Sequence, residues 1–176
     1  MKILAIETSC DDTGISIIKT PQNKRSDFDA SPVWLRPRVF SNIISSQIEI
    51  HKKYGGVYPM MAKREHQRNL LLVLTQALEE SKLLNPKFPA FAKASAGRQI
   101  SNHKQIQNSK FKILKNILAR EDTLYEQLEV FLNKYEKPAL DLIAVTEGPG
   151  LEPCLWVGVN FAKALSFFWN IPIVPV

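Results

Sequence analysis

The sequence predicts an α/β fold: a mixed β-sheet built from an antiparallel meander and parallel strands, with helices packed against it. Three observations support this class. The chain opens with two short apolar runs joined by a polar turn (residues 1–19), the pattern of a β-hairpin. Residues 61–83 repeat apolar side chains at helical spacing. Two apolar runs at 140–146 and 171–176 flank a helix-length segment, as parallel strands of α/β proteins do.

The polar turn of the first hairpin carries side chains suited to a binding site. Thr8 and Ser9 supply hydroxyls, Asp11 and Asp12 supply carboxylates, and Gly14 lets the backbone bend. Hydroxyls and free backbone N–H groups can cradle phosphate, and adjacent carboxylates can hold a cation or position a water molecule. The alternative is an ordinary hairpin tip whose Ser and Asp side chains only satisfy the turn's own backbone.

A third strand is predicted after the hairpin. Residues 20–32 are rich in Pro, Asn, Asp and Ser, which indicates a surface loop. Residues 33–47 then carry β-branched and aromatic side chains around Pro37, and the best strand within them is Val39 to Ser45. This strand would extend the hairpin into a meander.

A helix is predicted from about Met61 to about Leu83, after a loop punctuated by glycines and Pro59. His51 and His66 are fifteen positions apart and fall on different elements, and the sequence offers no obvious third partner for a metal. We therefore predict helix-start and surface roles for both histidines. The apolar stripe of the helix consists of Leu70, Leu74, Ala77 and Leu78.

An insertion is predicted at about 85–110. The segment is poor in large aliphatic side chains and rich in Asn, Gln, Lys, Ala and Ser, so it cannot bury enough surface to fix a fold. We expect a flexible surface loop that includes His103. Residues 111–132 then carry apolar side chains at helical spacing and predict one amphipathic helix packed against the sheet.

A second candidate binding loop follows the apolar strand at 140–146. Glycines on both sides of Pro149, at Gly148 and Gly150, make a turn whose backbone a ligand can approach closely. The helix predicted from about Leu155 to Asn170 directs its positive N-terminal end toward the same place. Taken alone, this turn is better explained as an ordinary strand-to-helix connection.

The composition indicates a globular chain, with 45% hydrophobic and 23% charged residues among 176. Cys10 and Cys154 are far apart, so neither a zinc site nor a disulfide framework is indicated. The apolar stretch 155–176 is interrupted by polar residues and Pro172 and is not a membrane span. Since no secretory signal is visible after Met1, a soluble, cytoplasmic protein is expected.

Charge is distributed unevenly along the chain. The net charge is +6, but the first 120 residues hold twenty basic and nine acidic side chains, a surplus of +11. Such asymmetry is compatible with docking a polyanion such as tRNA, and equally with a solvated basic surface.

Three stretches resemble the tRNA N6-adenosine threonylcarbamoyltransferase family. They are ETSCDDTG at 7–14, YGGV-P--A-REH at 54–66 (preceded by SQ and His51) and IAVTEGPGL at 143–151. A match in both spacing and identity is more specific than a generic motif. The resemblance implies a lobe of the actin-like ATPase (RNase H-like) architecture. We therefore expect residues 1–176 to form a single N-terminal lobe of a two-lobe enzyme.

The resemblance also implies a reaction and a set of site residues. The family transfers the threonylcarbamoyl group from threonylcarbamoyl-AMP to N6 of adenine 37 of tRNA. Asp11 and Asp12 would be catalytic, organising the substrate or a metal-bound water, while Ser9, Gly148 and Gly150 would bind the substrate. A divalent metal ion (iron) is implied for the full-length family, with ligands outside this chain, so no metal ligand is assigned here. Implied partners are tRNA, a non-catalytic paralogue and an ATPase.

Two alternatives share the architecture: a non-catalytic scaffold paralogue that forms a heterodimer with the transferase, and a lobe of a small-molecule kinase. The resemblance covers only the first part of the family's length and stops before the family's His-x-x-x-His motif. We therefore expect a truncated, incomplete form of the enzyme. Residues 1–176 alone are predicted to show no threonylcarbamoyl transfer, and measurable transfer by this polypeptide would refute that.

Overall fold

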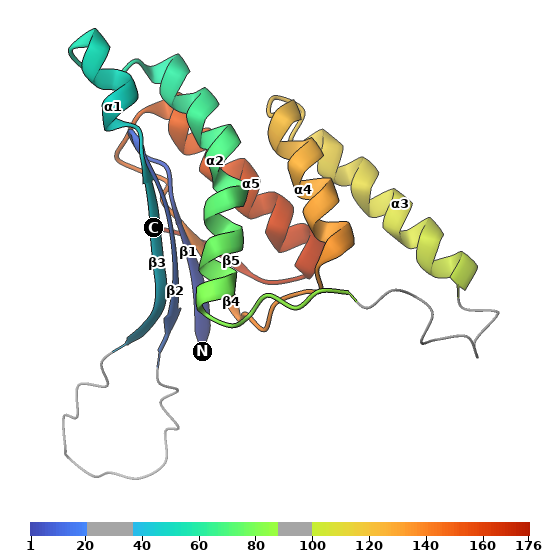
Figure 1. Ribbon diagram of the computed structural model, residues 1–176. Helices are drawn as coiled ribbons and strands as arrows, with labels where there is room; N and C mark the ends of the chain where they lie inside the picture. The colour runs from blue at the N-terminus through green and yellow to red at the C-terminus, as the bar shows by residue number, and fades with distance from the viewer. Residues whose placement is uncertain (21–36, 88–99) are drawn as a thin grey trace, which may run out of the picture.

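The computed structural model describes residues 1–20, 37–87 and 100–176 and centres on a five-stranded sheet in the order β3-β2-β1-β4-β5 (Figure 1). β1 pairs antiparallel with β2, and β2 with β3, whereas β4 runs parallel to both β1 and β5. The predicted mixed sheet is therefore confirmed. The strands are β1 (Lys2–Glu7), β2 (Asp12–Lys19), β3 (Arg38–Ser46), β4 (Leu142–Val145) and β5 (Ile173–Pro175).

Successive side chains along each strand point to opposite faces of the sheet, and the two faces differ chemically. Leu4 and Ile6 of β1 and Ile15 and Ile17 of β2 are all buried on one face. The opposite face carries small side chains where the three central strands meet, because Ala5 pairs with Ser16 and with Ala144. One face is thus built for packing and the other leaves room above it.

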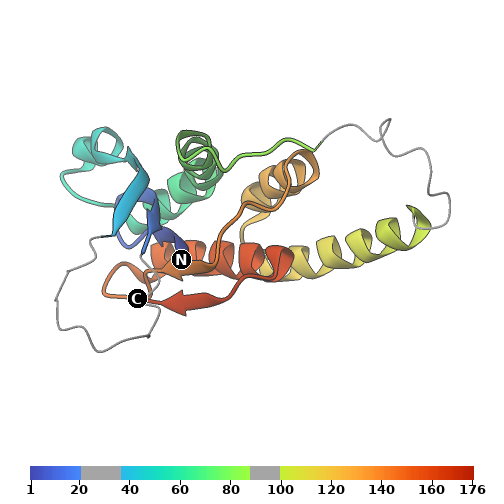
Figure 2. The ribbon, with the colours of Figure 1, turned by 90° about the horizontal axis from the view of Figure 1, so that it is seen from below.

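Helices α2 and α5 cover the apolar face of the sheet, and α4 and α3 lie farther from it (Figures 1 and 2). Pro occupies the first turn of both α2 and α5, where its missing N–H has no partner to lose. The helices are α1 (Ile48–His51), α2 (Pro59–Glu80), α3 (Ile100–Ile117), α4 (Asp122–Lys134) and α5 (Glu152–Trp169), with a 3₁₀ turn at Lys52–Tyr54.

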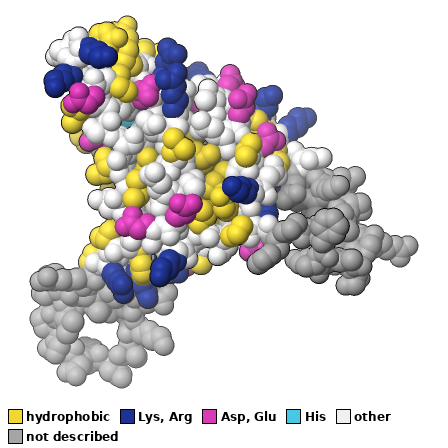
Figure 3. Space-filling model, in the orientation of Figure 1, with side chains coloured by type: hydrophobic (Ala, Val, Ile, Leu, Met, Phe, Trp, Pro, Cys, Tyr) yellow, Lys and Arg dark blue, Asp and Glu magenta, His cyan; other side chains and the backbone are white. Residues whose placement is uncertain are grey.

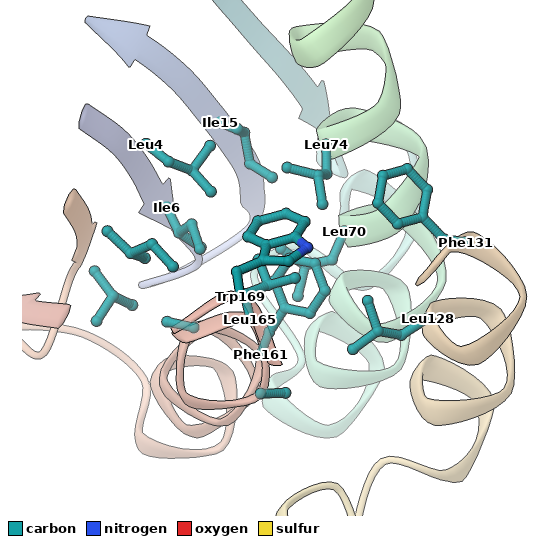
Figure 4. Close-up of a cluster of buried hydrophobic side chains, with 14 of the residues drawn as sticks. Leu4, Ile6, Ile15, Leu70, Leu74, Leu128, Phe131, Phe161, Leu165 and Trp169 are labelled. Atoms are coloured by element: carbon teal, nitrogen blue, oxygen red, sulfur yellow. The ribbon is translucent and has the colours of Figure 1, made fainter. Parts of the chain in front are cut away.

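The hydrophobic core lies between the sheet and these helices (Figure 4). Phe161 of α5 and Leu70 and Leu74 of α2 are fully buried against the strands. On the other side of α2, Leu128 and Phe131 of α4 close the cluster. The core thus fixes α2 against β2 and β3 and α5 against β1 and β4, which positions the loops at the strand ends.

The predicted helix at 111–132 is wrong in one respect, because the chain forms two helices there. The apolar spacing passes through Glu121, which is buried and lies 4.0 Å from the Lys63 ammonium and 3.4 Å from the Asn160 amide nitrogen. Its backbone N–H bonds the Leu118 carbonyl. The chain therefore turns at Glu121, and α4 begins at the next residue.

The predicted flexible loop at 85–110 also needs correction, because residues 100–110 belong to α3. The C-terminal part of α3 is docked by Phe111, whose ring lies 5.3 Å from that of Phe168. Residues 100–117 contain neither Gly nor Pro, so a helix nucleated at the docked end can extend backwards. Residues 88–99 of the predicted insertion, and the predicted surface loop apart from Thr20, lie outside the described residues.

In the portion of the chain that the structure describes, none of the helices combines the length and apolar character needed to cross a bilayer.

Candidate functional site

The two predicted binding loops meet at one end of the sheet. β1 and β4 are parallel neighbours, so the loops that follow them emerge at the same edge. The Leu151 N–H donates to the Ser9 carbonyl at 2.7 Å, and the Thr8 hydroxyl donates to the Cys154 carbonyl at 3.0 Å. The structure therefore joins the Ser9–Asp12 loop (the first loop) to the Gly148–Leu151 loop (the second loop) directly.

Gly150 makes this contact possible. A Cβ atom at Gly150 would lie 2.5 Å from the Ser9 carbonyl oxygen and 2.8 Å from the Ser9 Cβ, distances that real side chains do not tolerate. Gly148, in the same turn, has nothing within 4 Å of the position of a Cβ. The two glycines are both exposed but differ in function, since only Gly150 is required for contact between the loops.

Glu7, at the end of β1, accepts hydrogen bonds both from the first loop and from the residue that follows β4. One carboxylate oxygen accepts from the Ser9 N–H at 2.5 Å, and the other accepts from the Thr146 hydroxyl. Burial alone would raise the pKa of Glu7, but the hydrogen bonds from Ser9 and Thr146 outweigh it and hold the pKa below its usual value. Glu7 is therefore a fixed carboxylate that joins the first loop to the end of β4.

A shallow pocket of about 310 Å³ opens beside the loops on the face of the sheet that carries the small side chains. Ala5, Gly14 and Ala144 form part of its floor, and Asp12 and Glu7 line it from the loop end. Asp12 is exposed, and Asp11 beside it is half-buried. The pocket thus offers carboxylates above an uncharged floor, an arrangement that can orient a polar ligand.

The two cysteines near the loops are protonated thiols. Burial and the neighbouring Asp11 carboxylate raise the pKa of Cys10, and burial raises the pKa of Cys154 to about 11. A thiol with a raised pKa holds little thiolate at neutral pH and is a poor nucleophile. Cys154 is fully buried on α5, so it acts as a core side chain.

The predicted surface roles of the two histidines are wrong. His51 and His66 are 3% and 0% exposed. His66, in the middle of α2, contacts the first loop: its Nδ1 lies 2.7 Å from the Thr13 hydroxyl and its Nε2 3.1 Å from the Cys10 carbonyl. Burial lowers the pKa of His66, although the Cys10 carbonyl and the charges of nearby carboxylates oppose this.

The position of His66 could have been found in the sequence. Extending the stripe of Leu70, Leu74 and Ala77 back by one helical turn reaches His66, which therefore faces the core. On β2, Thr13 shares the face of Ile15 and is a buried hydroxyl that needs a partner. The missed signal was therefore one polar side chain, His66, on the apolar face of α2 and another, Thr13, on the apolar face of β2.

Among the described residues, no group of three or more His, Cys, Asp and Glu side chains could hold a metal ion. The described residues therefore do not fit the metal that the family resemblance implies, and no metal ligand is assigned among them.

Sequence comparisons with known proteins point to one family. The family model for tRNA N6-adenosine threonylcarbamoyltransferase matches residues 38–95 and 123–176, more than half of the chain. The proteins of that name from Fusobacterium nucleatum and Bacillus subtilis are 35% and 32% identical over the whole chain, which covers 32% of each. This chain thus spans about a third of the length of these curated relatives.

Among solved structures, YeaZ from Pseudomonas aeruginosa aligns with the whole chain and 44% of its own, at 12% identity and a TM-score of 0.45. The sequence matches carry the assignment without it. The family model matches more than half of the chain, including YGGV-P--A-REH and the second loop. The chain therefore belongs to the tRNA N6-adenosine threonylcarbamoyltransferase family.

Proposed function

We propose that this chain forms the N-terminal lobe of an enzyme that transfers threonylcarbamoyl from threonylcarbamoyl-AMP to N6 of adenine 37 of tRNA. The observation that supports this most directly is the contact between the two loops, in which Leu151 donates to Ser9 and Gly150 packs against it. Two separated segments that resemble one family are in direct contact, as residues that bind one substrate together would be.

In the proposed reaction, the N6 amine attacks the carbamoyl carbon, a C–N bond forms, and the bond from that carbon to the phosphate oxygen breaks. AMP leaves, and the amine loses a proton. Asp12, which lines the pocket, is proposed to orient the amine or to accept its proton. Asp11, the neighbouring residue of the first loop, does not line the pocket and is proposed to help organise the substrate from the loop. The Ser9 hydroxyl and the exposed backbone at Gly148 and Gly150 are proposed to contact the adenylate.

The metal ion implied for the family is proposed to be held by residues outside this chain. Proposed partners are tRNA, a non-catalytic paralogue and an ATPase. The surplus of basic side chains in the first 120 residues supports tRNA as the polyanion.

A chimera tests the proposal. This chain would replace the matching third of the Bacillus subtilis relative, and the product would be incubated with tRNA and threonylcarbamoyl-AMP. Digested tRNA is then assayed for threonylcarbamoyladenosine by mass spectrometry. We expect the chimera to modify tRNA and Asp12→Asn to reduce the rate at least about a hundredfold, as loss of an acid–base group does. A chimera that melts cooperatively and binds threonylcarbamoyl-AMP, yet leaves tRNA unmodified, would contradict the proposal.

A further inference from the structure

Three consecutive carbonyls of the first loop are each held by a different part of the fold. The Ser9 carbonyl accepts from the Leu151 N–H at 2.7 Å, and the Asp11 carbonyl accepts from the Gln47 N–H at 2.9 Å. Between them, the Cys10 carbonyl bonds the His66 ring at 3.1 Å. Two of the three donors are backbone amides, and the donor to Cys10 is a titratable side chain.

The contacts of His66 assign its tautomer. A carbonyl oxygen can only accept, so Nε2 must carry the hydrogen that is donated to Cys10. In the neutral ring Nδ1 is then an acceptor, and it faces two donors: the Thr13 hydroxyl at 2.7 Å and the Gln47 amide nitrogen at 3.4 Å. In the Nε2–H tautomer, each polar contact of the buried ring therefore pairs a donor with an acceptor.

A second buried histidine supports the same arrangement. His51, at the end of α1, accepts from the Tyr58 N–H at 3.3 Å through Nδ1 and donates from Nε2 to the Gln47 side-chain oxygen at 3.1 Å. This bond fixes the Gln47 amide with its nitrogen toward His66. A chain of directed hydrogen bonds therefore runs from the turn before α2 to the first loop.

We propose that His66 is a positioning residue: its neutral Nε2–H form holds the Cys10 carbonyl and so sets the position of the Asp11 and Asp12 side chains. The inference rests on the proposed function only in taking these carboxylates as catalytic. The position of the loop can be measured without any substrate.

Protonation of His66 would change the contacts of the ring. It would place a hydrogen on Nδ1, which the Thr13 hydroxyl can turn to accept, but the Gln47 amide nitrogen would then face a donor, and Gln47 cannot turn over without breaking its bond to His51. The charged groups around the ring are Glu7 from β1 and Asp11 and Asp12 from the first loop and β2, all of which favour the imidazolium, whereas burial opposes it. On α1, His51 reaches the ring through Gln47. The Nε2–H bond to Cys10 persists in the imidazolium, so the loop amides report the added charge and the lost Gln47 contact as the pH falls below the ordinary histidine range.

Nuclear magnetic resonance of the ¹⁵N-labelled 176-residue chain tests the inference. Long-range ¹H–¹⁵N spectra of the ring report its tautomer, and the amide resonances of Cys10, Asp11 and Asp12 report the loop between pH 8 and pH 5. We expect the Nε2–H tautomer at pH 8, and loop amides that titrate with the same midpoint as the His66 ring.

Three variants separate positioning from packing. His66→Gln keeps an N–H donor near the Nε2 position, so the loop amides should stay near their wild-type positions at pH 8 and lose the shared titration. His66→Leu fills the space without a donor, so the amides should move at every pH, and the Gln47 amide, which donates to the Asp11 carbonyl, should exchange with solvent at least tenfold faster. Arg64→Gln, on the exposed side of the same helix, should change neither reading.

An Nδ1–H tautomer would overturn the inference. So would loop amides that keep their pH dependence in His66→Gln, or a His66→Leu loop like that of the wild type. If His66→Leu does not fold, the wild-type titration and His66→Gln decide between the outcomes. No reading involves tRNA or threonylcarbamoyl-AMP, so failure of the proposed transferase function leaves this result interpretable.

Discussion

Gly158 shows at the scale of one residue why α5 can approach β1 closely. A Cβ at Gly158 would lie 2.3 Å from the Thr8 hydroxyl oxygen, which is itself buried and donates to the Cys154 carbonyl. The hydroxyl cannot move aside without losing that bond. Gly158 therefore brings the first turns of α5 against the end of β1, where the two loops begin.

Gly158→Ala is expected to destabilise the chain. The added methyl overpacks a buried contact, a loss of about 1–3 kcal/mol, which exceeds the gain of about 1 kcal/mol for replacing Gly in a helix. In a Thr8→Ala background the clash is absent, so the same substitution should no longer destabilise. Urea unfolding measures all four proteins of this cycle. Gly56→Ala, where a Cβ meets nothing, is the control, and a Gly158→Ala protein as stable as the wild type would contradict the account.

Glu7 gives the chain a pH-dependent contribution to stability. Its folded-state pKa lies below the unfolded value of 4.5, so this contribution is present above pH 4.5 and is lost as the pH falls through the folded-state pKa. Glu7→Gln replaces one acceptor oxygen by an NH₂ donor, which then faces another donor, either the Ser9 N–H or the Thr146 hydroxyl, and should lose about 1–3 kcal/mol at pH 7. The difference in unfolding free energy between the two proteins should shrink as the pH falls from about 7 through 4.5 and below, and a constant difference would exclude this role.

Sequence patterns predicted the residues of the loops better than the residues that support them. Asp11, Asp12 and Ser9 were visible because their chemistry is exposed in a polar turn. Glu7 and His66 support that turn from buried positions, and a buried polar residue is identified only when its partner on another element is known.

At the scale of elements, the junction between the two loops depends on one glycine of the second loop. In Gly150→Ala the added Cβ meets backbone of Ser9, so the loops must separate and the Leu151-to-Ser9 hydrogen bond lengthens. We expect a stability loss of about 1–3 kcal/mol and displaced amide resonances at Leu151 and Cys10. Gly148→Ala is the matched stability control, expected within about 0.5 kcal/mol of wild type. Equal effects of the two substitutions would show that the loops are not in contact.

Glu121 makes the corner between α3 and α4. Burial raises its pKa, and the Lys63 ammonium and the Asn160 amide only partly offset that. Glu121→Gln keeps the shape and the contact with Asn160 without a buried charge, so its stability should equal or exceed that of the wild type. Glu121→Ala leaves a cavity and should lose about 2–3 kcal/mol. Thermal melts at pH 7 compare the two, and a larger loss for Gln than for Ala would contradict this reading.

The sequence predicted the strands and the long helix well, because period-two and helical patterns in β1, β2 and α2 directly reflect one buried face. It missed the α3–α4 corner because Glu121 occupies a position that continues the apolar spacing. Only its contacts with α2 and α5 show that the chain turns there.

At the scale of the whole molecule, the basic side chains that Figure 3 shows are not gathered into one patch. On the face in Figure 3, Lys and Arg side chains form several separate groups with acidic side chains between them. Some are paired, as Arg68 is with Glu65 at 2.7 Å. A spread surface of this kind favours non-specific attraction of a polyanion over one dedicated groove.

Binding of tRNA should therefore depend strongly on salt, falling about tenfold or more between about 50 and about 200 mM salt. Lys115 is an exposed lysine in the last turn of α3 and belongs to the first 120 residues, which carry the basic surplus. Lys134 is an exposed lysine in the last turn of α4 and belongs to the acidic remainder of the chain. Lys115→Glu should weaken binding in fluorescence anisotropy more than Lys134→Glu does. Salt-independent affinity, or equal effects of the two variants, would argue against this electrostatic account.

The central claim is that the first and second loops form one site for the adenylate. Titration of the ¹⁵N-labelled chain with threonylcarbamoyl-AMP tests it most directly. The account predicts that amides of Ser9–Asp12 and Gly148–Leu151 shift along one saturation curve, and that Gly150→Ala weakens this binding at least about tenfold. Shifts confined to one loop, or centred away from both, would contradict the claim.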